Sequence, residues 1–253
     1  MGIWAVRRAG SRWRVSDFAL PEEVPVALVL NGSTVAVLMA TPHDLSDLLQ
    51  GFTASEGIAP ETDEIDIVRH AKGIEARGRI SDDRAEALSA RRRQSVGPLG
   101  CGLCGIDSLE AATREVPPVP PLAPGVAQKA AAALRALDAA QVLRRAFHGM
   151  HAAGIYGPEG LIVSREDVGR HNALDKVLGA HGRAPNSRHA LVVTSRLSLD
   201  LVQKAATMGY SGLFSPASPT AAAVALAQSC GMTLGLVGAG APVLFSAPQE
   251  GAA

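Results

Sequence analysis

The chain has 253 residues, with 24 Lys and Arg balanced by 24 Asp and Glu. This balance predicts no general attraction to nucleic acid or to an anionic membrane. No apolar run reaches the roughly 18 residues that a membrane span needs, and the first residues lack the apolar core of a secretory signal. Three cysteines are too few for a disulfide scaffold. We therefore expect a globular protein of the cytoplasm, with neither nucleic acid nor membrane as a partner.

The N-terminal part has the pattern of a small α+β structure. Two β-rich runs, Val24–Leu30 and Thr34–Met39, flank Asn31-Gly32, a dipeptide typical of a hairpin because it accepts positive φ. Thr41-Pro42 then looks like an N-cap followed by proline at the first helical position, and leucines at helical spacing follow. Residues 65–79 hold one or two strands. These patterns predict a hairpin, a helix and further strands in this order.

A proline-rich stretch separates this part from the rest of the chain. Val116–Gly125 contains five prolines, so it should be stiff, extended and unable to pair in a sheet. We predict an N-terminal α+β part at 1–115, a linker at 116–125 and an α/β cofactor-binding domain at 126–253. The last opens with an Ala-rich, helix-forming stretch, Ala127–Phe147.

The remaining sequence alternates between strand and helix patterns. Such a series predicts a mostly parallel sheet with helices on both faces, so the expected fold class is α/β with a smaller α+β part before it. The expected strands are Leu161–Ser164, Ala190–Thr194, a short one near Leu213-Phe214, and Met232–Val237. The expected helices are Asn172–Ala180, Leu197–Met208 and Thr220–Ser229.

Polar turns follow three of these strands, at 165–172, 194–198 and 215–220. In open α/β sheets, ligands bind outside the carboxyl ends of the strands, where helix N-termini offer free N–H groups. A solvated loop with a helix cap explains part of the first turn, because Asn172 could be the N-cap and Asp175 its weak capping-box partner. Ser218-Pro219-Thr220 is likewise better explained as a capped helix start, with proline at the first helical position. Together the turns suit an anionic, nucleotide-like ligand. The first turn crowds together Arg165, Glu166, Asp167, Arg170 and His171.

Cys101 and Cys104 form a C-x-x-C flanked by glycines. Zinc binding is disfavoured because a structural site needs four ligands, although His148 and His151 are a distant possible pair. A thioredoxin-type site is disfavoured because glycine and proline precede the pair where a strand is expected. The third interpretation is a nucleophilic thiol on a glycine-rich loop. Cys230, at a helix end, is most simply a buried small residue.

The C-x-x-C motif also occurs in zinc-dependent deaminases. Their chemistry needs His-x-Glu in addition to the cysteines, and no histidine here is followed two residues later by Glu. Deamination is therefore disfavoured.

Several segments together resemble the formate dehydrogenase accessory sulfurtransferases, the FdhD family. The order and spacing of these segments agree with that family from about residue 24 to 237. They are VPVALVLNG from Val24, GFTASEGI from Gly51, GCGLCG from Gly100, Met150 to Ala153, REDVGRHNALDKVLG from Arg165, TSRLSLDLVQKAA from Thr194 and SPTAAAV from Ser218.

The resemblance implies a function. Proteins of this family accept persulfide sulfur from a cysteine desulfurase and deliver it to the molybdenum cofactor of formate dehydrogenase, bis-molybdopterin guanine dinucleotide. The resemblance also implies a homodimer, a C-terminal part like cytidine deaminase, and no metal of the protein's own. The partners would be the desulfurase and the catalytic subunit of formate dehydrogenase.

The resemblance also implies roles for particular residues. Cys101 would carry the persulfide and Cys104 would assist it. The cofactor-binding residues would be Asp167, Arg170, His171, Asn172, Lys176, Thr194, Ser195, Arg196, Ser198, Leu236, Val237, Gly238, Ala239, Gly240 and Ala241.

The chain departs from the family pattern at a few positions. Ser55 replaces a usual threonine, Thr194-Ser195-Arg196 a usual Ser-Gly-Arg, and Asp200 a usual glutamate. The segment after Leu236 lacks the family's arginine, which weakens the expectation of phosphate binding there. A cofactor-binding chaperone without sulfur transfer is the alternative function, and the retained C-x-x-C favours the sulfurtransferase.

Overall fold

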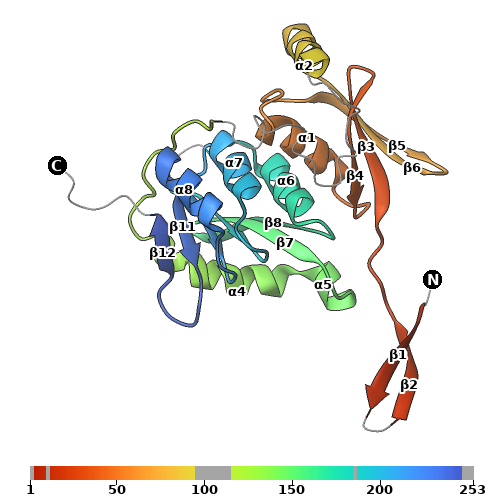
Figure 1. The fold of residues 1–253 in the computed structure, drawn as a ribbon, viewed down its shortest axis with the longest axis vertical. Helices are drawn as coiled ribbons and strands as arrows, with labels where there is room; N and C mark the ends of the chain where they lie inside the picture. Colours follow the sequence, from red (N-terminus) through yellow and green to blue (C-terminus); the bar gives the residue numbers. More distant parts are fainter. Residues whose placement is uncertain (1–2, 10–11, 95–114, 185–186, 247–253) are drawn as a thin grey trace.

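The computed structural model describes residues 3–9, 12–94, 115–184 and 187–246, which form sheets of two, four and six strands (Figure 1). Cys101 and Cys104 lie outside these ranges. β1 (Ile3–Ala9) and β2 (Arg12–Phe18) form an antiparallel hairpin that the sequence analysis did not predict. No helix among the described residues has both the length and the apolar composition that a bilayer crossing requires.

The N-terminal unit, residues 24–94, is a four-stranded sheet with two helices. Its strands run in the order β4-β3-β6-β5, with β3 parallel to β6 and the other neighbours antiparallel. Helix α1 packs on one face, over a core of branched and small apolar side chains. The elements are β3 (Val24–Leu30), β4 (Ser33–Ala40), α1 (Leu45–Ser55), β5 (Asp63–His70), β6 (Gly73–Arg79) and α2 (Asp82–Gln94).

The predicted hairpin is confirmed, and its turn is also hydrogen-bonded to a residue outside the hairpin. Asn31 and Gly32 have φ of 46° and 78°, the positive values that this turn requires. The Asn31 side chain accepts a hydrogen bond from the Ile80 nitrogen at 2.8 Å and donates one to the Ile80 carbonyl at 3.0 Å. The turn is therefore tied to the end of β6.

The C-terminal unit, residues 115–246, is built on the six-stranded sheet in the order β12-β11-β10-β9-β7-β8. β9, β10 and β11 are parallel, whereas β7 is antiparallel to both neighbours and β12 is antiparallel to β11. The strands are β7 (His151–Gly157), β8 (Gly160–Asp167), β9 (Ala190–Val193), β10 (Gly212–Ser215), β11 (Thr233–Leu236) and β12 (Val243–Ser246). The α/β class is confirmed, but the predicted series lacked β7 and β12. The Ala- and Gly-rich sequence of β7 has few β-branched residues, which explains the omission.

Helices cover both faces of this sheet, as predicted. α6 (Arg170–His181), α7 (Leu199–Thr207) and α8 (Ala221–Cys230) enclose the larger core on one face, and α4 (Ala130–Ala140) packs on the other (Figure 1). The predicted helix over 127–147 is broken. A 3-10 turn, Ala127–Lys129, precedes α4, and Gln141 in an extended conformation separates α4 from α5 (Val142–Ala146).

The proline-rich stretch lies along the C-terminal unit. The Val119 nitrogen donates to the Cys230 carbonyl at 2.8 Å, and the Ala123 nitrogen donates to the Ser187 carbonyl at 3.0 Å. Val119 is buried in the core beside α8. Cys230 is also buried, as expected from the sequence. These hydrogen bonds fix the connection to the surface of the unit that it precedes.

Helices α1 and α6 join the two units at close range (Figure 1). A Cβ placed on Gly51 would overlap the Asp175 carbonyl oxygen, and one on Gly179 would overlap the carbonyl oxygen of Asp47. Only glycine lets the two backbones approach this closely. The contact brings the end of β4 and the end of α1 against α6.

Candidate functional site

Four strands of the six-stranded sheet end on the same side, and we call this side the carboxyl edge. It comprises the ends of β8, β9, β10 and β11 and the turns that follow them. Backbone bonds hold these turns together: the Thr220 nitrogen donates to the Leu197 carbonyl at 3.0 Å, and the Val237 nitrogen donates to the Ser215 carbonyl at 2.7 Å. The Ser215 hydroxyl donates to the Ser195 carbonyl. The second and third polar turns predicted from the sequence are therefore neighbours, and the contact of His171 with Asp200 joins the first turn to the start of α7.

Two helices begin at this edge without a side-chain cap. Gly169 precedes α6 and Ser198 precedes α7, and neither provides a side-chain cap hydrogen bond. The N–H groups of their first turns carry partial positive charge and suit an anion. Helix α8 differs, because the Thr220 hydroxyl accepts from the Ala223 nitrogen at 3.2 Å. The predicted helix start is confirmed, but its cap is Thr220, and Pro219 precedes the helix instead of occupying its first position.

Charged and polar side chains surround these two helix starts. His171 Nε2 faces the Asp200 carboxylate. Among the described residues, the buried Arg170 Nε and Ser198 Oγ have no hydrogen-bond partner. An unpartnered buried donor is costly, so these two atoms favour a ligand at this edge. Burial lowers the pKa of His171 despite the opposing charge of Asp200, and Arg170 adds to the lowering.

His151 belongs to the same edge and was not among the predicted site residues. It begins β7 opposite Asp167 in the β7–β8 register, and it is partly buried. Burial lowers its pKa, and the nearby Arg170 acts in the same direction. The sequence signal was its place in the Met150–Ala153 segment, but without β7 that segment had no position in the fold.

Three predicted cofactor-binding residues are part of the joint between the two units. Asp167 and Lys176 are fully buried and form an ion pair at 2.6 Å. Asp167 also accepts from the Thr41 nitrogen at 3.0 Å, and Lys176 donates to the Thr41 carbonyl at 3.0 Å. Asn172 donates to Asp167 at 3.0 Å and to the Met39 carbonyl at 2.8 Å. These side chains are satisfied within the protein.

Two predicted helix caps are wrong for the same reason. Asn172 lies inside α6, whose N-cap is Gly169, and its amide is used by the joint. Thr41 does not cap α1, which begins at Leu45. The Thr41 hydroxyl instead accepts from the Val168 nitrogen at 3.1 Å. Tertiary hydrogen bonds therefore replaced the local ones that the sequence suggested.

A second buried ion pair lies further along α6. Asp175, predicted as the capping-box partner of Asn172, instead binds Lys204 of α7, with both carboxylate oxygens at 3.0 Å from Nζ. Ser55 donates to Asp175 at 2.7 Å, and Glu56 accepts from Lys204 at 2.7 Å. Ser55 and Glu56 end α1. The segment GFTASEGI therefore meets the segments of α6 and α7 at this pair.

The remaining predicted residues lie at the carboxyl edge in different surroundings. Thr194 accepts from the Ala152 nitrogen at 3.0 Å and holds β7 against β9. Ser195 is buried, and Arg196 is exposed beside it. Leu236 ends β11 and the buried Val237 follows it, and an exposed loop then leads to β12. That loop consists of Gly238, Ala239, Gly240 and Ala241.

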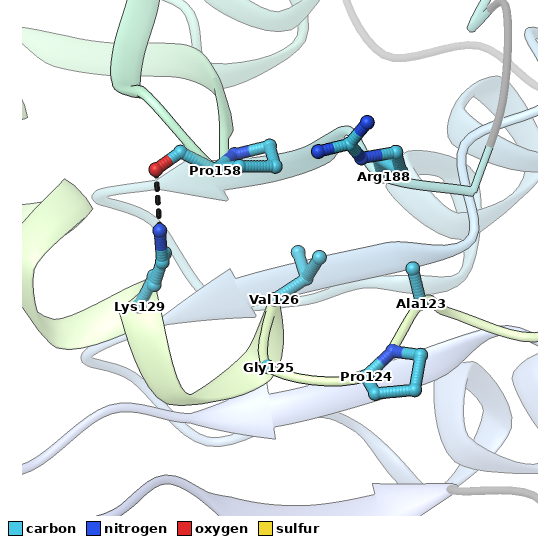
Figure 2. A pocket seen from close by; sticks show the side chains of 7 residues that line it. All are labelled: Ala123, Pro124, Gly125, Val126, Lys129, Pro158 and Arg188. Carbon is cyan, nitrogen blue, oxygen red and sulfur yellow. Dashed lines mark hydrogen bonds between the residues drawn. The ribbon is translucent and has the colours of Figure 1, made fainter.

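One hollow in the C-terminal unit lies away from this edge. Its volume is about 190 Å³, and Figure 2 shows the Lys129 ammonium bound to the Pro158 carbonyl at its side, with Arg188 also in its wall. Pro158 follows the end of β7 and Arg188 precedes β9, so this hollow is at the opposite end of the sheet. Within the described ranges, no group of three or more His, Cys, Asp and Glu side chains is placed to hold a metal ion.

Curated proteins from several bacteria are similar to this chain over most of its length. The "Sulfur carrier protein FdhD" of Agrobacterium fabrum is 47% identical, with 85% of this chain and 82% of that protein covered. The protein of the same name from Brucella abortus is 48% identical, with 88% and 86% covered. The protein from Cupriavidus necator is 42% identical, with 96% and 88% covered.

A solved structure shares the fold. It is described as that of a candidate formate dehydrogenase accessory protein from Desulfotalea psychrophila, and it superposes with a TM-score of 0.76 at 26% identity. The match covers 99% of this chain and 98% of the other. The model of the FdhD/NarQ family matches residues 21–250. With these relatives and this match, the chain belongs to the FdhD/NarQ family.

Proposed function

We propose that this protein is a sulfur carrier for formate dehydrogenase and that its carboxyl edge binds the guanine dinucleotide form of the molybdenum cofactor. The observation that carries the proposal is the pair of uncapped helix starts, α6 and α7, where the buried Arg170 Nε and Ser198 Oγ are unpartnered among the described residues. The names of the relatives support the sulfur-carrier role.

The residues of this edge fit a phosphate-bearing ligand. The first N–H groups of α6 and α7 can donate to phosphate oxygens, and the Arg170 guanidinium supplies a fixed positive charge. Ser198 adds a hydroxyl donor. When bound, the cofactor would supply the metal that takes sulfur as a terminal ligand. Arg196, exposed next to Ser195, is available for a second phosphate contact.

Sulfur would reach this edge through Cys101. The Cys101 thiolate attacks the outer sulfur of a persulfide on the cysteine desulfurase, a new sulfur–sulfur bond forms, and the donor cysteine leaves as a thiolate. Cys101 then carries the outer sulfur. If the Cys104 thiolate attacks the inner sulfur, hydrosulfide is released and a Cys101–Cys104 disulfide forms, which a dithiol reductant must reopen.

Intact-mass analysis tests the sulfur transfer. The parent and the Cys101→Ala, Cys104→Ala and Cys230→Ala variants are incubated with cysteine and a cysteine desulfurase. We expect the parent and Cys230→Ala to gain one sulfur that a thiol removes, and Cys101→Ala to gain none. Cys230 is the matched control because it is buried. If no form gains sulfur while guanosine diphosphate still binds, sulfur transfer is rejected and a cofactor-binding chaperone remains.

A further inference from the structure

Helices α6 and α7 face each other through two charged pairs, one helical turn apart. The first is His171 with Asp200, at the carboxyl edge. The second is Asp175 with Lys204, four residues later on each helix and almost fully buried. Residues four apart lie on the same side of a helix, so the second pair stands directly behind the first. The second pair therefore fixes how α6 and α7 are placed where they begin.

The second pair is completed from the N-terminal unit. Lys204 Nζ lies 2.7 Å from Glu56 Oε1 and 3.1 Å from the Ser55 hydroxyl, in addition to Asp175. Two carboxylates thus share one buried ammonium group. Breaking such an arrangement leaves an uncompensated charge in the interior, so the end of α1 is coupled to the starts of α6 and α7.

Some of the same charges also shift the pKa of His171. Burial is the main cause of its lowered pKa, and Arg170 and Lys204 lower it further. Asp200 and Glu56 act in the opposite direction. Glu56 and Lys204 therefore influence this imidazole with opposite signs, although neither belongs to the turn that carries it.

We propose that Glu56, acting through Lys204, is a positioning residue of the carboxyl edge: it holds the α6–α7 pair in place and sets the charge that His171 presents to an anionic ligand. The part that concerns the ligand rests on the proposed function. In this arrangement, the N-terminal unit contributes to the binding site without touching the ligand, because its carboxylate compensates the ammonium group behind the site.

The titration of His171, followed by NMR and assigned with His171→Gln, tests the proposal. Glu56→Gln keeps an oxygen for Lys204 and removes the negative charge, so the His171 pKa should fall. Lys204→Met should raise it, and Lys204→Arg should return it toward the parent value. A general loosening of the site would instead raise the pKa in every variant, because it would reduce burial.

Asp47→Asn is the matched control. Asp47 also lies on α1 and pairs with the C-terminal unit, through Arg165 Nε at 2.7 Å, but it is not among the main causes of the His171 pKa shift. The proposal predicts an unchanged His171 titration in this variant. A rise in Glu56→Gln, or an equal shift in Asp47→Asn, would overturn it, and Glu56→Gln decides the question even if Lys204→Met does not fold.

Calorimetry with guanosine diphosphate over a pH series extends the test to the ligand. A protonated His171 favours the anion, so binding should strengthen as pH falls through the His171 pKa. The increase in affinity should occur at lower pH in Glu56→Gln than in the parent, and at the same pH as the parent in Asp47→Asn. If the parent binds no nucleotide at any pH, the proposed ligand fails, whereas the NMR titration still decides the role of Glu56.

Discussion

Gly51 of α1 and Gly179 of α6 are in backbone contact: a Cβ on Gly51 would lie 2.7 Å from the Gly179 nitrogen, and one on Gly179 would lie 2.8 Å from the Gly51 nitrogen. These distances are shorter than any ordinary carbon–nitrogen contact, so neither position accepts a side chain without displacing a helix. The joint between the two units depends on this pair.

Gly51→Ala should therefore lower the free energy of unfolding by about 3 kcal/mol or more, because backbone rather than a flexible side chain must move. Urea denaturation measures the change. Gly238→Ala is the control, since nothing lies within 4 Å of its Cβ position, and it should change stability by less than about 0.5 kcal/mol. An equally small effect of Gly51→Ala would contradict the close helix contact.

Lys176→Met should be strongly destabilising. It leaves the Asp167 carboxylate fully buried without its ion-pair partner, and removal of one partner of a buried pair costs about 3–5 kcal/mol. Lys129→Met removes an exposed amine and should cost less than about 0.5 kcal/mol. Denaturation curves of the two variants under the same conditions provide the comparison. Equal stabilities would show that the Asp167–Lys176 pair contributes nothing.

Acid should destabilise the protein through its partly buried histidines. Burial lowers the pKa of His181, the neighbouring His189 adds to this, and a backbone hydrogen bond at Gly182 opposes it. The unfolded chain titrates near the ordinary value of 6.5, so below this pH the unfolded state binds more protons than the folded one. The free energy of unfolding therefore decreases as pH falls from 6.5 toward the lowered pKa.

His181→Asn should reduce that decrease. Urea unfolding at about pH 7.5 and about pH 5.5 gives the change in stability for parent and variant, and the variant should lose less on acidification. His151 and His171 shift in the same direction, so part of the acid sensitivity should remain. A variant as acid-sensitive as the parent would show that His181 titrates normally in the folded state.

Arg170→Gln should weaken guanosine diphosphate binding about tenfold, because a charged hydrogen bond to phosphate contributes roughly 1.5–3 kcal/mol. Arg165→Gln is the matched control, because Arg165 lies near the end of the preceding strand, β8. Its guanidinium is held by Asp47, so its replacement should change the affinity by no more than about twofold. Calorimetry measures the affinity of both variants for guanosine diphosphate. An equal loss of affinity in the two variants would place the ligand elsewhere.

Local sequence signals were reliable where the chain satisfies its own backbone. Asn31-Gly32 predicted its hairpin because few other residues accept two positive φ angles in succession. Alternating apolar runs predicted β9, β10 and β11 and the helices between them to within two residues. The start of α8 was predicted to within one residue, and there the Thr220 hydroxyl has a local donor at Ala223.

Tertiary contacts decided what sequence periodicity could not show. The sequence by itself determined the α/β class, the motif that identifies the family, and three polar turns that meet at one sheet edge. Only the tertiary structure separated these polar residues into two groups. Asp167, Asn172 and Lys176 turn inward because Met39 at the end of β4 and Thr41 just after it supply donors and acceptors for them. Arg170 and Ser198 keep polar atoms unpartnered among the described residues. Hydrogen bonds between residues more than 100 positions apart leave no periodic trace in a sequence.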